Sequence, residues 1–133
     1  MKTTLLATTT AFAFICSYFF NLAMENSDQY LAVVAVIFMD GFFGVIAGTK
    51  REGFKTYKAV RILKTLTAWI ITLTALIMVE AGFKGTSWLS ETILIPLIVF
   101  QVISALKNAE QAGFIKNEAL AAILDKIDKH KTK

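Results

Sequence analysis

The chain carries four apolar runs, each long enough to cross a lipid bilayer as a helix. A helix rises about 1.5 Å per residue and a bilayer core is about 30 Å thick, so about 20 apolar residues suffice. The runs cover residues 3–24, 30–48, 65–83 and 88–106. This pattern predicts an all-α membrane protein, with four transmembrane helices in a domain over residues 1–106.

The first run also has an alternative reading as a cleaved signal peptide, because Lys2 gives it a short positive flank. Ala11 and Ala13 are followed by further apolar residues instead of a polar mature start. Ile15 stands before Cys16, where a lipoprotein signal requires a small residue. We therefore expect the run to remain as the first span.

A polar, basic tail over residues 107–133 follows the fourth run. Within it, Leu120, Ile123, Leu124 and Ile127 recur at helical spacing with charged residues opposite. Asn117 is suited to cap the start of such a helix. The tail is predicted to form a short amphipathic helix in the cytoplasm.

Composition supports lipid as the solvent and argues against an enzyme. Hydrophobic residues make up 56% of the 133 residues and charged ones 18%, whereas soluble domains are usually about 45–50% apolar and 25% charged. Cys16 is the one cysteine, and His130 the one histidine. Because familiar nucleophile, phosphate-binding and metal-binding motifs are missing as well, we expect no catalytic residue, cofactor or metal.

In a soluble domain, a net charge of +4 would suggest nucleic-acid binding. Here the distribution of the charges along the chain predicts the membrane topology instead. In a four-span arrangement, 13 of the 14 Lys and Arg residues fall on one side, and Lys84 falls on the other. The positive-inside rule then places both termini in the cytoplasm. The segment between the second and third spans is expected to be a cytoplasmic basic loop that contacts anionic lipid headgroups, with no nucleic-acid partner. Its cations are Lys50, Arg51, Lys55, Lys58, Arg61 and Lys64.

Asp40 lies near the middle of the second run, where an ionised carboxylate costs about 2.5–3.5 kcal/mol. Gly44, Ala47 and Gly48 share its helical face, and such stripes of small residues let helices approach closely. We expect the stripe to form a helix-packing and oligomerisation face, or to line a pore. The alternative is that the second helix is displaced and Asp40 pairs with a cation such as Arg61.

Two stretches resemble the phage holin family that is related to the clostridial toxin-secretion holin. The segment that begins Asp40-Gly41-Phe42-Phe43-Gly44 is similar to that family's D-x-x-x-G-hydrophobic-hydrophobic-A signature. A second segment, with Ser104, Asn108 and Gly113, resembles the S-I-x-E-N-x-x-x-x-G pattern that precedes the family's basic tail. The similarity covers roughly residues 30–130.

The resemblance implies a multi-pass protein of the bacterial host inner membrane that forms homo-oligomers. Such a protein permeabilises the bilayer and releases or activates a cell-wall hydrolase, an endolysin, or exports a protein. Two alternatives stay open. One is a non-lytic scaffold that docks partners through its C-terminal helix, favoured by Gln101 and Lys107 standing where the family usually has glutamates. The other is a small proton-coupled exporter that uses Asp40.

Overall fold

A computed structural model describes residues 1–131, and within this range the elements are helices joined by short connections. The helices are α1 (Lys2–Glu25), α2 (Ser27–Glu52), α3 (Thr56–Gly82), α4 (Leu89–Gln111) and α5 (Asn117–Lys131), with the 3-10 turn η1 (Lys84–Thr86) before α4. Four of them, the last counted together with η1, are long and apolar enough to cross a membrane. The predicted all-helical chain with four candidate spans is confirmed.

The connection after α2 is much shorter than predicted. We expected a basic loop over residues 50–64, but the helices leave only residues 53–55 between them. Lys50 and Arg51 belong to the last turn of α2, whereas Lys58, Arg61 and Lys64 belong to α3. Gly53 adopts a φ of +80°, a left-handed conformation that glycine accepts without strain, and this ends α2 abruptly.

The chain divides into two compact units, Met1–Leu31 and Ala32–Lys133. This division concerns packing, whereas the predicted boundary after residue 106 separates membrane from cytoplasm and stays a prediction. In the first unit, nearly every side chain of α1 is exposed, and Leu22 is the buried residue of that helix. The hydroxyls of Thr8, Thr9 and Thr10 donate to carbonyls one turn back. Those threonines therefore satisfy their own helix, as polar groups in an apolar surrounding must.

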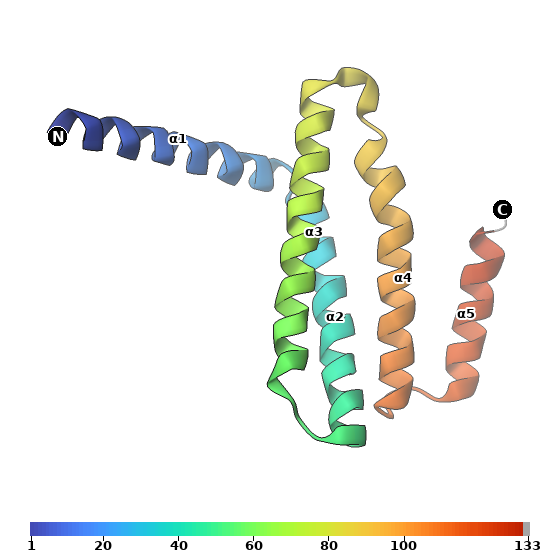
Figure 1. The fold of residues 1–133 in the computed structure, drawn as a ribbon. Coiled ribbons are helices and arrows are strands. Elements are labelled where there is room, and N and C mark those ends of the chain that lie inside the picture. The colour runs from blue at the N-terminus through green and yellow to red at the C-terminus, as the bar shows by residue number, and fades with distance from the viewer. Residues whose placement is uncertain (132–133) are drawn as a thin grey trace. The chain divides into compact units, whose positions relative to one another are not determined.

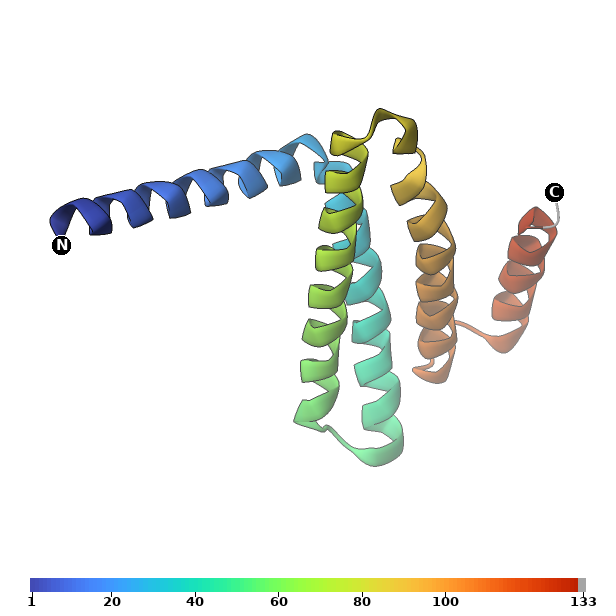
Figure 2. The ribbon, with the colours of Figure 1, turned by 45° about the horizontal axis from the view of Figure 1, so that its top comes forward.

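In the second unit, α2, α3 and α4 run lengthwise beside one another, and α5 turns back along α4 (Figures 1 and 2). The buried apolar side chains lie along the three long helices and include Val33, Ile37, Leu73, Ile77 and Leu94. The other large apolar side chains on these helices are half-buried or exposed. An outward apolar surface suits a helix bundle whose solvent is lipid.

Polar contacts fix both ends of α4. At its start, the Ser90 backbone N–H donates to Glu80 Oε1 of α3 at 2.6 Å, so a carboxylate satisfies an otherwise free amide of the first turn. At its end, Gly113 has a φ of +89°. The Gly113 N–H donates to the Glu110 carbonyl and the Phe114 N–H to the Ala109 carbonyl, both at 2.9 Å. This pattern is a Schellman motif, which explains why a glycine stands at position 113.

The tail contains the predicted helix, but its start differs from expectation. Asn117 is the first residue of α5, and the Lys116 carbonyl accepts the N–H of Leu120 at 3.0 Å. Leu120 is buried, and Leu124 and Ile127 are half-buried. Lys131 Nζ lies 5.1 Å from the centre of the Phe100 ring on α4, a cation–π contact.

Candidate functional site

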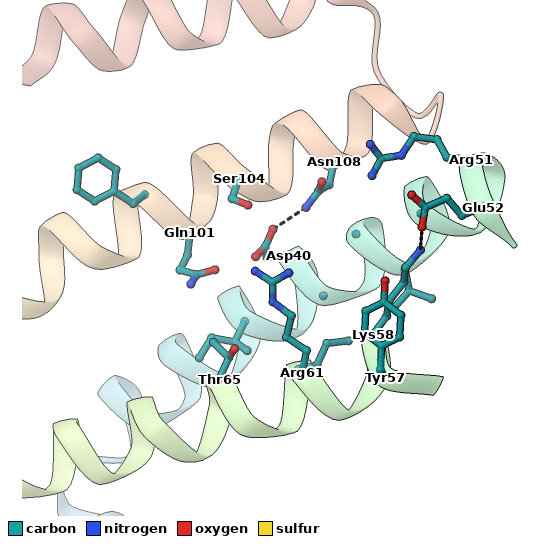
Figure 3. A pocket seen from close by; sticks show the side chains of 17 residues that line it. Asp40, Arg51, Glu52, Tyr57, Lys58, Arg61, Thr65, Gln101, Ser104 and Asn108 are labelled. Carbon is teal, nitrogen blue, oxygen red and sulfur yellow. Dashed lines mark hydrogen bonds and ion pairs between the residues drawn. The ribbon is translucent and has the colours of Figure 1, made fainter. Parts of the chain in front are cut away.

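A cleft of about 570 Å³ lies between α2, α3 and α4 and is lined mainly by polar side chains (Figure 3). Asp40, Gly44 and Gly48 of α2 contribute to its wall, as do Ser104 and Asn108 of α4. The structure therefore brings together the two stretches that carry the family resemblance. The remaining lining residues are Ile37, Gly41, Val45, Arg51, Glu52, Tyr57, Lys58, Arg61, Ile62, Thr65, Phe100 and Gln101.

A hydrogen bond between α2 and α4 crosses this cleft. Asn108 Nδ2 donates to Asp40 Oδ1 at 2.9 Å, and both side chains are half-buried. Asp40 and Gly44 are one helical turn apart, and so are Ser104 and Asn108, so each pair lies on one face of its helix. The spacing in the sequence therefore indicates one face on α2 and one on α4. It does not indicate that the two faces meet.

Arg61, the cation that we considered as a partner for Asp40, makes no ion pair with it. In Figure 3 the Arg61 guanidinium points toward the Asp40 carboxylate, yet no ion pair within 4.0 Å joins the two among the described residues. The partner of Asp40 is instead an amide. A neutral donor satisfies a carboxylate oxygen without requiring a second desolvated charge.

Glycines allow the helices to approach closely around Asp40. A Cβ built on Gly41 would lie 2.7 Å from Ile62 of α3, and one on Gly44 would lie 3.3 Å from Asn108 Nδ2. A Cβ on Gly48 would collide with the Lys58 amine. Ala47 is buried but does not line the cleft. The small stripe thus faces α3 and α4 of the same chain, and its contact with another copy stays a prediction.

These contacts also change the expected depth of Asp40. Counted along α2 alone, Asp40 lies about 12 Å inside the apolar run that ends at Gly48. Its partner Asn108, however, lies only about 3 Å past the end of the apolar run of α4. The apolar runs of α2 and α4 are therefore offset along the helix axes, and Asp40 is level with the end of the apolar run of α4.

The end of α2 is held to α4 and α3 by charged groups. The Lys50 amine donates to the Ala112 carbonyl at the end of α4, where a cation also complements the helix dipole. Glu52, beyond the apolar run of α2, lies 3.5 Å from Lys55 Nζ and 3.7 Å from Lys58 Nζ. Attraction to Lys55 and then to Lys58 holds the pKa of the Glu52 carboxyl below its usual value.

The cleft lacks the groups of a familiar catalytic or metal site. No group of three or more His, Cys, Asp or Glu residues that could hold a metal occurs within residues 1–131, and Cys16 of α1 is exposed. The lining instead combines amides, hydroxyls, three basic side chains and two carboxylates. Such a set can hydrate a passage, bind anions or join helices.

The model of the bacteriophage holin family matches residues 14–129. The chain belongs to the bacteriophage holin family. No curated protein and no solved structure is detectably similar to it. Family membership and the four candidate spans make this holin a multi-pass protein of the bacterial inner membrane. The family permeabilises membranes and is not an enzyme family. Its relation to the clostridial toxin-secretion holin stays a prediction.

Proposed function

We propose that this holin assembles into homo-oligomers that permeabilise the inner membrane and thereby release or activate a cell-wall hydrolase. Both termini and the segment between α2 and α3 lie in the cytoplasm in this proposal, as the charge distribution predicts. The observation that carries the proposal is the match to the bacteriophage holin family, and the polar cleft between α2, α3 and α4 supports it.

The open cleft gives a physical reason for assembly. Polar residues within the predicted apolar runs, such as Asp40, Gln101 and Ser104, line the cleft and are only half-buried, so this chain alone does not cover them fully. Polar groups that face acyl chains without partners cost free energy, and intramembrane ionisable residues face protein or water. A second copy placed over the cleft, or water held between copies, supplies the missing partners.

The outer surfaces of α2, α3 and α4 support the same proposal. Many of their large apolar side chains are exposed, among them Phe38, Phe42, Ile71 and Ile95. A chain with a small buried core and wide apolar faces can exchange contacts within a copy for contacts between copies, because lipid and protein are similarly apolar. Assembly can then depend on how much protein accumulates in the membrane.

Inducible expression in a bacterium tests the function. Cells would express the holin alone or together with a peptidoglycan hydrolase that has no export signal, and uptake of a membrane-impermeant dye and culture turbidity would be followed. We expect dye uptake in both cultures and lysis only with the hydrolase. Intact membranes despite abundant holin would contradict the proposal and favour the scaffold function.

A further inference from the structure

One end of the cleft is rich in cations. Arg51 in the last turn of α2 lies there with Lys58 and Arg61 from the first turns of α3. We call these three residues the cationic end of the cleft. In Figure 3 Lys58 lies beside Glu52 and Tyr57, Arg51 projects from the end of α2, and the Arg61 guanidinium points toward Asp40.

The two carboxylates that line the cleft, Asp40 and Glu52, are fewer than its three cations. Glu52 lies 3.7 Å from Lys58 and is shared with Lys55 at 3.5 Å. Within residues 1–131, neither Arg51 nor Arg61 has a carboxylate within 4.0 Å or donates a side-chain hydrogen bond. The Arg61 guanidinium points toward the Asp40 carboxylate without forming an ion pair within 4.0 Å, so the cationic end keeps an excess of positive charge.

The offset of the helices makes this excess charge important. Because Gly41 packs against Ile62, the first turns of α3 lie beside the last apolar turns of α2. A charge at such a boundary between apolar and polar surroundings requires a counter-ion or water. The anions found at this depth in a bilayer are the phosphates of lipid headgroups.

We propose that the cationic end binds the phosphate of an anionic glycerophospholipid from the cytoplasmic leaflet. Each guanidinium is a planar fork that matches two phosphate oxygens. Gly48 lets the Lys58 amine lie against α2, where a Cβ would collide with it. Val45 and Ile62, which also line the cleft, provide apolar surface next to the phosphate for acyl carbons. This proposal requires the membrane location but not permeabilisation, so the two can fail separately.

Lipid retention by the full-length purified protein tests the proposal. Native mass spectrometry and thermal unfolding in detergent would be recorded with added phosphatidylglycerol, with phosphatidylcholine and with inorganic phosphate. We expect retention of phosphatidylglycerol and a raised midpoint of unfolding with that lipid, and no comparable effect of phosphatidylcholine. Equal effects of the two lipids, or an equal effect of inorganic phosphate alone, would overturn the assignment to an anionic lipid.

Variants locate the binding site. Arg51→Gln and Arg61→Gln are each expected to weaken phosphatidylglycerol binding about fivefold, the equivalent of the usual contribution of one cation near an anionic membrane. Lys84→Gln removes a cation outside the cleft and should leave binding unchanged. Circular dichroism would verify that each variant is folded. Folded Arg51→Gln and Arg61→Gln proteins that bind the lipid like Lys84→Gln would contradict the site.

Discussion

At the scale of single residues, the Asp40 carboxylate is satisfied by a hydrogen bond from the Asn108 amide. The sequence indicated that an acid inside an apolar run needs a partner, and it identified Asn108 only as part of a family-like pattern. It could not indicate that the two residues meet, because they are 68 positions apart in the chain. Their pairing depends on how α2 and α4 are offset along their axes. Gly113 is a similar case, since its role in the Schellman motif requires the backbone conformation.

Replacing Asn108 tests the interhelical hydrogen bond. Asn108→Ala leaves the Asp40 carboxylate without its donor and is expected to lower the free energy of unfolding by about 1 kcal/mol, a typical value for such bonds between membrane helices. Unfolding by sodium dodecyl sulfate in mixed micelles measures this change. Asn117→Ala, at the exposed start of α5, is the control. Identical stabilities of the two variants would argue against the bond.

At the scale of elements, the length of the apolar runs was enough to predict the spans, but not the true extent of α3. That helix begins at Thr56, nine residues before the predicted third span. Hydropathy detects where a helix enters lipid. The helix itself also includes Lys58, Arg61 and Lys64, because lysine and arginine are good helix formers. The consequence is a basic helical start, with Lys58 and Arg61 in the cleft, instead of a basic loop.

Enlarging Gly44 tests the close packing of α2 against α4. In Gly44→Leu, the new side chain would displace Asn108 from Asp40, since even a Cβ lies 3.3 Å from the amide. We expect the onset of dye uptake after induction to shift by more than the variation between replicate cultures, and Asp40→Asn to shift it as well.

Gly82→Leu serves as the comparison, because a Cβ at Gly82 has no neighbour within 4 Å. Its onset should match that of the unmodified protein at equal expression. Unaltered timing in both Gly44→Leu and Asp40→Asn would remove the cleft from the mechanism.

At the scale of the whole molecule, charge distribution predicts an orientation that helix packing does not determine. Lys84 in η1 and Lys55 between α2 and α3 lie at opposite ends of α3 and are both exposed. Each is replaced by cysteine in a Cys16→Ser background, which leaves one thiol for labelling. Before any dye uptake begins, a membrane-impermeant maleimide should label Lys84→Cys in intact cells and Lys55→Cys only in lysed cells. The opposite labelling would reverse the orientation.

The central claim is that assembly of this chain by itself opens the bilayer, and release of a trapped dye from vesicles tests it most directly. Purified holin would be reconstituted in phosphatidylglycerol-containing liposomes over a series of protein-to-lipid ratios. If copies must associate to cover and line the polar cleft, release should rise more steeply than in proportion to protein density, and Gly44→Leu should shift the curve. Vesicles that retain the dye at every protein density would contradict the account.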